Sequence, residues 1–396
     1  AKWEKAEFAL VDFDDTGLEA QGVKWDAGTK TLDITNAKGD ATFSFNVEGA
    51  SGVDKNVTPK YDRLAKSIGG VSKLDGIVNV GAVVGGKIGM KIKTPVQNNP
   101  KVPLDIEVVI ADAGDPNAKD VITIKSRPDY DGTNIQPVMM KTKDNKLVFW
   151  APVNVGATEI PTIVPQADSE PGGTNVITKS CGQLFQWGRK YGFENTNNKT
   201  DTDAEKFKGE APLGYPKGGK DVANMSPWDG KFILESYSSP NTRGNWFLFN
   251  TDGSDNTYDA EVSVGEWYQQ LWNEGTEESP VKTDYDPCPA GWRVPTLTEW
   301  KAIGADYSVT HDWDSTNHLL TIAGAESDQK LILPAVGKRK YDSGDSSDQG
   351  RCGYYWSSSV WFDRGGKVGF ASFSTARLSV GELSRAHGHS VRCIQE

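Results

Sequence analysis

The sequence lacks long apolar runs and basic clusters, and both absences exclude classes of protein. Its longest apolar candidate, Ile77 to Val84, is interrupted by Asn79 and Gly81 and is far shorter than the roughly 18 residues that a membrane-spanning helix needs. Lys and Arg do not cluster, and the formal net charge is −11 over 396 residues. Nucleic acid and anionic membranes both attract clustered positive charge. We therefore expect no membrane span and no nucleic-acid partner.

A signal peptide and a CxxC cysteine spacing are also missing. The chain opens on Ala1, Lys2 and Trp3, without a basic start and an apolar run, as a mature chain does. A cytosolic protein has the same opening, so only the cysteines can indicate whether the chain is secreted or cytosolic. An even number without CxxC spacing suits two disulfides, and hence an extracellular chain, better than a metal site. Buried free thiols are the alternative. The four cysteines are Cys181, Cys288, Cys352 and Cys393.

The composition changes between residues 130 and 150, which predicts two domains. Only Trp3 and Trp25 precede Trp150, whereas every cysteine and histidine follows it. In the first part, apolar residues alternate with polar ones over short stretches separated by Gly, Asn, Asp and Pro, as strands do. Such strands are typical of an immunoglobulin-like β-sandwich. We expect this all-β sandwich at 1–130, a linker at 131–145 and a second domain at 146–396.

The second domain combines strands with two predicted helices. Leu147 to Trp150 is a continuous apolar strand. Thr296 and Glu299 have the spacing of a capping box, so a short helix is expected to begin there and end near Gly304. A second helix is expected from Ser180, with Leu184, Trp187 and Tyr191 as its apolar stripe. Helices inserted among short aromatic strands predict an α+β domain.

Seven ordered motifs in this second domain resemble one known family. The resemblance covers roughly residues 140–396 and is to the Fibrobacter succinogenes major paralogous domain, which also occurs in Bacteroidales surface proteins and has a C-type lectin-like fold. The motifs are FWAPVNVG (149–156), CGQLFQWGRKYGF (181–193), LWNEG (271–275), DPCPAGWRVPTLTEW (286–300), LILPAVGKR (331–339), GYYWSSS (353–359) and HSVRCI (389–394).

The resemblance implies both a disulfide pattern and a function. Lectin-like folds bridge a cysteine before the WRxP turn to one in the last strand, which here implies Cys288–Cys393 and leaves Cys181 and Cys352 as the second pair. The implied function is a non-catalytic cell-surface adhesion protein, such as a fimbrial (pilus) tip subunit. Its expected location is secreted, at the cell surface or in a fimbrium. The expected partners are a surface glycan or protein of the host or of bacteria, and other pilus subunits that donate a strand.

The candidate ligand-binding residues are Trp361, Tyr341 and Asp342. An exposed Trp361 has an apolar face suited to stacking on a sugar ring. Tyr341 and Asp342 open an acidic loop that ends at Gly350. This loop and Thr251 to Asp259 contain oxygen donors for calcium, but both lack the EF-hand order, and solvated turns are the favoured interpretation.

No cofactor and no metal are expected. SEPGG (169–173) and LWNEG (271–275) do not match the EPN or QPD loop and the WND strand of calcium-dependent lectins. His387 and His389 could face one side of a strand and hold a metal, yet a third ligand is not apparent nearby in the sequence. The run Ser357 to Ser359 lacks a GxSxG context and is expected to be a polar strand edge rather than a nucleophile.

Two alternatives to adhesion remain. One is a carbohydrate-binding accessory module for glycan use. The other is an enzyme similar to the formylglycine-generating enzymes, which share a similar turn. The chemistry of those enzymes depends on a reactive cysteine pair close to the C-terminus, and here only Cys393 is that late. A structural role for Cys393 favours the non-catalytic function.

Overall fold

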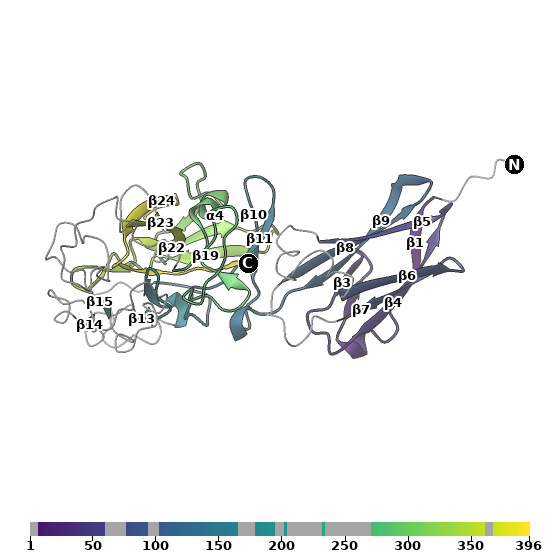
Figure 1. Ribbon diagram of the computed structural model, residues 1–396, viewed down its shortest axis with the longest axis horizontal. Coiled ribbons are helices and arrows are strands. Elements are labelled where there is room, and N and C mark those ends of the chain that lie inside the picture. Colours follow the sequence, from purple (N-terminus) through teal and green to yellow (C-terminus); the bar gives the residue numbers. More distant parts are fainter. Residues whose placement is uncertain are drawn as a thin grey trace. The chain divides into compact units, whose positions relative to one another are not determined.

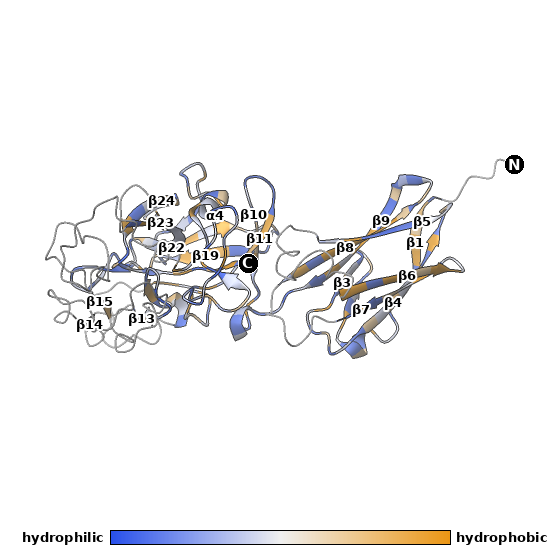
Figure 2. Cartoon of the chain, in the orientation of Figure 1, coloured by the Kyte–Doolittle hydropathy of each residue, from blue (hydrophilic) through white to orange (hydrophobic). Residues whose placement is uncertain are grey.

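A computed structural model describes residues 7–59, 77–93, 103–164, 179–194, 202–203, 232–233, 271–360 and 367–396. The chain divides after Pro137 into two compact units, and each is described by itself (Figure 1). Both are rich in β-strands, which Figure 2 shows carrying hydrophobic stretches in orange. Over these residues, none of the helices is long and apolar enough to cross a membrane.

The first unit contains two β-sheets. Its strands are β1 (Ala9–Asp14), β2 (Lys24–Asp26), β3 (Thr31–Asp33), β4 (Ala41–Glu48), β5 (Val53–Pro59), β6 (Val78–Val84), β7 (Lys87–Ile92), β8 (Leu104–Asp112) and β9 (Asp115–Ser126). One sheet has the order β1-β4-β7-β6 and the other β2-β3-β9-β8-β5. All neighbours are antiparallel except β3 and β9, which pair in parallel. A short 3-10 helix, Glu19–Gln21, precedes β2.

The two sheets share one apolar core. Side chains alternate between buried and exposed along β7, as expected for a strand with one face in the core. Trp25 of one sheet contacts Phe43 of the other, with ring centroids 4.7 Å apart. The strands predicted from alternation are therefore confirmed, and Ile88, Met90 and Ile92 are all buried.

The boundary after Pro137 falls inside the predicted linker at 131–145, and part of that stretch forms a strand. Residues 138–141 form strand β10 (Val138–Lys141), which pairs with β11 (Leu147–Trp150) in the second unit. A 3-10 helix, Tyr130–Gly132, lies just before it, and its Tyr130 is buried. The turn-forming residues of this stretch therefore surround one short hairpin strand, which a composition argument does not detect.

The second unit is built from several small sheets. Besides β10 and β11, its strands are β12 (Leu184–Gln186), β13 (Gly192–Phe193), β14 (Thr202–Asp203), β15 (Phe232–Ile233), β16 (Trp292–Arg293), β17 (Asp312–Asp314), β18 (Leu319–Ala323), β19 (Lys330–Pro334), β20 (Lys338–Arg339), β21 (Ser346–Ser347), β22 (Gly353–Val360), β23 (Lys367–Phe373), β24 (Ser379–Ser384), β25 (Gly388–Ser390) and β26 (Ile394–Gln395). The largest sheet follows the order β13-β12-β25-β22-β23-β24, with β20 and β21 joined through β25. The others are β10-β11-β26-β16, β17-β18-β19 and the pair β14-β15.

The first hairpin and the last strand of this unit meet. Trp150 of β11 pairs with Ile394 of β26, and Arg293 of β16 pairs with the same residue on its other side. Next to Ile394, Cys393 forms a disulfide with Cys288, 105 residues earlier in the chain. The end of the chain is thus fixed by backbone pairing and by a covalent bond.

The helix at the capping box is confirmed. α4 (Leu297–Ala302) has Thr296 as its N-cap, and Thr296 and Glu299 exchange both bonds of the box. Trp300 is completely buried and contacts Trp150, with ring centroids 4.7 Å apart. Together with Leu320, Leu333 and other residues they form one large apolar cluster. The helix thereby joins the sheet that contains β11 to the three-stranded sheet.

The helix predicted from Ser180 to Gly192 is wrong. Helical structure ends at Cys181, and Leu184–Gln186 is instead strand β12, whose three residues are all buried. Gly182 (φ +77°) and Gly188 (φ +86°) have left-handed backbone conformations that interrupt any helix. The spacing of the apolar residues also suits one face of a helix. Because all three residues of β12 are buried, however, both faces of this segment are covered, as in a strand inside a sheet.

Candidate functional site

An ion pair between half-buried Lys282 and buried Asp286 organises the turn before α4. Lys282 Nζ lies 3.0 Å from Asp286 Oδ1 and also donates to the carbonyls of Cys288 and Trp292. The Asp286 carboxylate accepts from the backbone N–H groups of Cys288 and Val294. Burial raises the pKa of Asp286, and Lys282 opposes this increase. These two side chains therefore hold the turn at Cys288, Trp292 and Val294.

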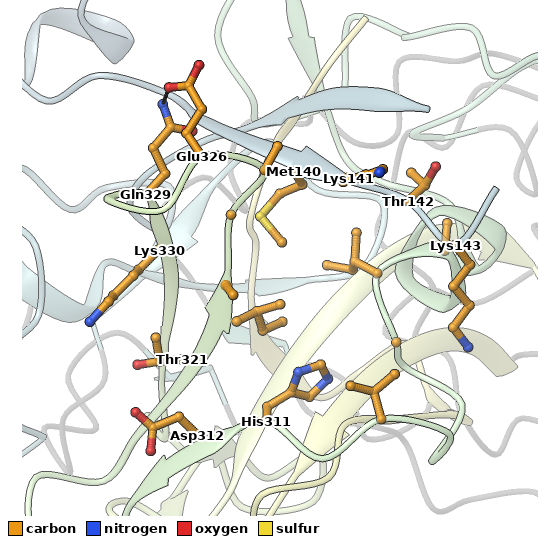
Figure 3. A pocket seen from close by; sticks show the side chains of 18 of the residues that line it. Met140, Lys141, Thr142, Lys143, His311, Asp312, Thr321, Glu326, Gln329 and Lys330 are labelled. Carbon is orange, nitrogen blue, oxygen red and sulfur yellow. Dashed lines mark hydrogen bonds between the residues drawn. The ribbon is translucent and has the colours of Figure 1, made fainter. Parts of the chain in front are cut away.

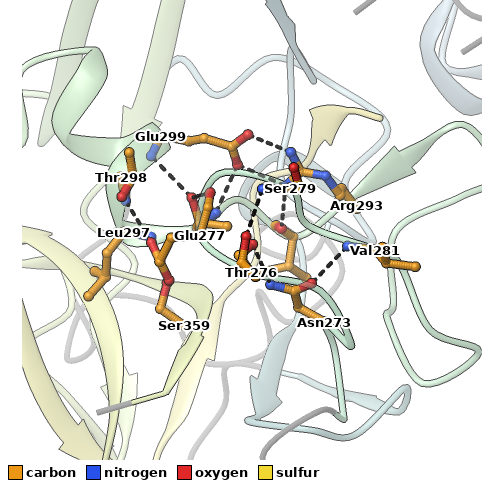
Figure 4. A network of polar contacts seen from close by, with 12 residues as sticks. Asn273, Thr276, Glu277, Ser279, Val281, Arg293, Leu297, Thr298, Glu299 and Ser359 are labelled. Atoms are coloured by element: carbon orange, nitrogen blue, oxygen red, sulfur yellow. Dashed lines mark hydrogen bonds and ion pairs between the residues drawn. The ribbon is translucent and has the colours of Figure 1, made fainter. Parts of the chain in front are cut away.

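A second polar network continues from this turn to the N-terminus of α4 (Figure 4). Arg293 donates to both oxygens of Glu299, and Glu299 Oε2 also accepts from the Thr296 N–H at 2.9 Å. Ser359 of β22 accepts from the Leu297 N–H at 2.8 Å. Ser357 to Ser359 are buried, so the predicted polar strand edge is wrong. At least one of these serines anchors the helix instead.

An open depression of about 690 Å³ lies beside this scaffold in the second unit (Figure 3). Its floor includes buried Met140, Ile303 and Ile322. Its rim is polar and draws on the β10–β11 hairpin, the segment after α4 and the β18–β19 hairpin. The labelled rim residues in Figure 3 include Lys143, Asp312, Thr321, Glu326, Gln329 and Lys330. An apolar floor with a polar rim is the usual design of a ligand site.

Two of the three walls are fixed to each other. Gln329 Oε1 accepts from the Met139 N–H at 2.8 Å, and the Ala325 N–H donates to the Met139 carbonyl at 2.6 Å. Gln329 also donates to Glu326 at 3.0 Å. The β18–β19 hairpin is thereby attached to β10, so the shape of this side of the depression does not depend on a ligand.

The third wall is the loop from Gly304 to His311. Lys143 donates to Asp306 and to Ser308, the latter at 2.6 Å. These bonds lower the pKa of the Asp306 carboxyl to about 2, with the Lys143 bond as the largest cause. Burial lowers the pKa of His311, which lines the depression, and the Gly304 backbone opposes this. At neutral pH the depression therefore presents a neutral imidazole, while the ionised Asp306 holds the loop through Lys143.

The predicted ligand-binding residues lie elsewhere. Tyr341 is half-buried, and its ring packs edge-on against His387 with centroids 4.7 Å apart. Asp342 is exposed. Neither residue lines the depression. Trp361 lies outside the described residues, as do SEPGG and the acidic loop from Thr251 to Asp259.

The two late histidines are buried in an aromatic cluster. His389 stacks on Trp356 with ring centroids 4.0 Å apart and on His387 at 5.6 Å. Burial lowers the pKa of His387 to about 4 and that of His389 well below its usual value. The stacked rings are neutral at physiological pH. Over the described parts of the chain, no group of three or more residues is arranged to hold a metal ion.

The acidic loop near Tyr341 commits one of its carboxylates to the protein. Asp348 accepts from Arg351 through Oδ1 and from the Tyr354 hydroxyl through Oδ2, and Lys338 Nζ lies 3.8 Å from the same Oδ2. Its oxygens are therefore already shared among three side chains. The side-chain carbonyl oxygen of Asn273 in LWNEG likewise accepts hydrogen bonds from the N–H groups of Gly275 and Val281.

The cysteines follow the prediction for one pair only. Cys288 and Cys393 form the disulfide that the resemblance implied. Cys181 and Cys352 are both free and buried, so the second predicted disulfide is wrong. Cys181 packs in an apolar cluster with Val164, Leu184, Leu319 and Val336. Cys352 instead interacts with Tyr354. The two thiols thus face different surroundings, and burial raises the pKa of Cys181 to about 11.

Comparison of the chain with known protein families finds no match, and neither does comparison with characterised proteins. The candidate site therefore rests on the geometry of this chain alone. Sequence reasoning missed the depression because residues 140–143 form one wall and residues between 302 and 330 form the other two, at least 159 residues later in the chain. None of these segments carries a recognisable motif.

Proposed function

We propose that the chain is a non-catalytic adhesion protein of the cell surface, such as a fimbrial tip subunit, and that its second unit binds the ligand. The depression between β10, the loop after α4 and the β18–β19 hairpin is the observation that carries this proposal. It is open, it combines an apolar floor with hydrogen-bonding groups at the rim, and two of its walls are fixed to each other. A preformed site of this kind binds with little ordering cost.

The fold types that we propose are an immunoglobulin-like sandwich for the first unit and a C-type lectin-like domain, related to the Fibrobacter succinogenes major paralogous domain, for the second. Two sheets around one core support the first assignment. The pairing of β11 with β26 and the Cys288–Cys393 disulfide support the second. Both features bring the two ends of the unit together, as the lectin-like pattern implies.

A location outside the cytosol is part of the proposal. Disulfides form and persist in secreted and surface proteins and are rare in the cytosol. The same bond weighs against a formylglycine-generating-like enzyme, because Cys393 is bonded to a cysteine 105 residues away rather than to a neighbour close to the C-terminus. Adhesion therefore remains the better proposal.

The last part of the proposed function is assembly with other pilus subunits through a donated strand. Among the described strands, β6 is an edge of its four-stranded sheet, and Val83 and Val84 are 39% and 75% exposed. This strand is orange along much of its length in Figure 2. An apolar edge strand offers unpaired backbone groups to an added strand. Such an edge is compatible with strand donation.

Filling the depression tests the proposed function. Thr321 lies on β18 and lines the site, so Thr321→Trp would occupy it with an indole ring. Thr316 is exposed in the β17–β18 turn and does not line the site, which makes Thr316→Trp the matched control. Beads coated with each form would be applied to a mucin-coated surface and to a glycan array.

The proposal predicts that wild-type and Thr316→Trp beads adhere equally and that Thr321→Trp reduces adhesion at least five-fold. Equal adhesion of all three forms would place the binding surface elsewhere on the chain. If neither surface retains wild-type beads, adhesion to these glycans is refuted.

A further inference from the structure

The loop from Gly304 to His311 exposes two large apolar side chains. Tyr307 is 59% exposed, and Val309, which lines the depression, is 40% exposed. Single exposed apolar residues are ordinary on protein surfaces. Tyr307 does not line the depression itself, but it lies two residues from Val309, which does. The backbone conformation of Tyr307 is also unusual.

Tyr307 has φ = +62°, a left-handed conformation that aromatic residues rarely adopt. Three sets of bonds hold it there. The Tyr307 N–H donates to the Leu378 carbonyl at 3.2 Å, and the His311 N–H donates to the Ala376 carbonyl at 2.7 Å. Between them, Ser308 donates to Asp306, which Lys143 also binds. A strained conformation that the surroundings impose is a recognised property of binding sites.

An arginine lies in the segment that holds this loop. Arg377 stands between Ala376 and Leu378, the two residues whose carbonyls hold the loop. It is exposed, and it forms no ion pair or hydrogen bond with the described residues. The acidic residues of this chain outnumber its basic ones by eleven. An arginine that has no partner among the described residues of such a chain is available for an anion from outside.

We infer that the ligand of this site ends in a sugar that carries a carboxylate. The Tyr307 ring would cover the apolar face of that sugar, and Arg377 would bind its carboxylate through two parallel hydrogen bonds. The neighbouring sugars would extend past Val309 into the depression. This inference rests on the proposed function and adds the class of ligand to it.

Paired glycans that differ only in charge test the inference. 3′-Sialyllactose and its methyl ester would be titrated against the full chain by biolayer interferometry, together with lactose. The variants are Tyr307→Asn, Arg377→Gln and Arg377→Lys. Asn tolerates left-handed backbone, so the first variant removes the ring and retains the loop. Tyr191, which is 46% exposed outside the depression, provides the control Tyr191→Asn.

The acid should bind at least ten-fold more tightly than its methyl ester or lactose. Tyr307→Asn and Arg377→Gln should each weaken that binding at least ten-fold, whereas Tyr191→Asn leaves it unchanged. The affinity of Arg377→Lys for the acid should fall between those of wild type and Arg377→Gln, because lysine keeps the charge but cannot form the two parallel hydrogen bonds. Melting temperatures within a few degrees of wild type would show that the variants remain folded.

Three results would overturn the inference. They are equal binding of the acid and its ester, unchanged binding by Tyr307→Asn and Arg377→Gln, and no binding of the acid at all. The proposed function is judged separately, by the adhesion of Thr321→Trp and Thr316→Trp beads to mucin. If Thr321→Trp abolishes adhesion while the Tyr307 and Arg377 variants bind normally, the depression is the site and the ligand is not recognised by its carboxylate.

Discussion

Removing the Cys288–Cys393 disulfide should destabilise the second unit strongly. The bond closes a loop of about 105 residues, and the chain-entropy model gives about 5 kcal/mol for a loop of that length. Unfolding entropy near 2 cal/mol/K per residue, summed over Val138–Gln395, turns this into a lower melting temperature by roughly 10 °C. The double variant Cys288→Ser/Cys393→Ser should show this shift.

Differential scanning calorimetry of the full chain would measure the shift and separate the two units. The melting of the first unit serves as an internal reference, because all four cysteines lie in the second. Both bonded cysteines are buried, so a reducing agent should act on wild type only during unfolding. It should have no further effect on the double variant.

Thiol counting completes this experiment. Denatured, unreduced protein should react with a thiol reagent at two cysteines, Cys181 and Cys352, and reduced protein at four. A melting temperature unchanged in the double variant would refute the stabilising role of the bond. A count of zero before reduction would refute the assignment of Cys181 and Cys352 as free thiols.

Three more predictions concern single residues of the described chain. Arg392 donates to Asn154 and to the carbonyls of Ala151, Pro152 and Ile332, so Arg392→Met should cost about 3 kcal/mol. Arg377→Met, at an exposed position, should hardly change the free energy of unfolding. Similar urea midpoints for the two variants would contradict a stabilising role of the Arg392 bonds. Unfolded His387 protonates near pH 6.5 and the folded residue near 4, so stability should fall by about 3 kcal/mol as the pH falls through this range. His387→Gln should flatten that slope in urea titrations at pH 7 and 4.5, and an unchanged slope would contradict the burial of a neutral imidazole. At Tyr307, a glycine variant should be more stable than an alanine variant by about 1 kcal/mol, whereas the usual opposite order would show that the backbone there is not left-handed.

Features encoded by neighbouring residues could be predicted from the sequence. The helix α4 and its cap were predicted correctly because Thr296 and Glu299 supply both partners of the capping box within four residues. The strands of the first unit followed from alternation, since β7 buries every second side chain. Local pattern and tertiary structure agree at these places.

Predictions failed where distant residues decide the structure. The apolar stripe from Leu184 to Tyr191 has helical spacing, but β12 is covered on both faces and pairs with β25 near the end of the chain. An even number of cysteines did not determine that Cys181 and Cys352 stay unpaired. Pairing depends on where each thiol points after folding.

The candidate site is also a feature that distant residues decide. Neither the left-handed backbone of Tyr307 nor the carbonyls that hold it, about 70 residues later, can be read from the sequence around Tyr307. The same holds for Arg377, which looks like an ordinary surface residue until the loop is placed beside it. Tyr341 was chosen for its acidic neighbours, yet its ring is used in packing against His387.

Hydrogen-exchange mass spectrometry of the glycan-bound chain tests the central claim, that the ligand occupies the depression, most directly. With the glycan that gives the strongest array signal, protection should increase in peptides that cover residues 139–146, 302–311 and 321–330, the three walls of the site. Protection confined to the first unit, or to the loop from Tyr341 to Gly350, would contradict the claim.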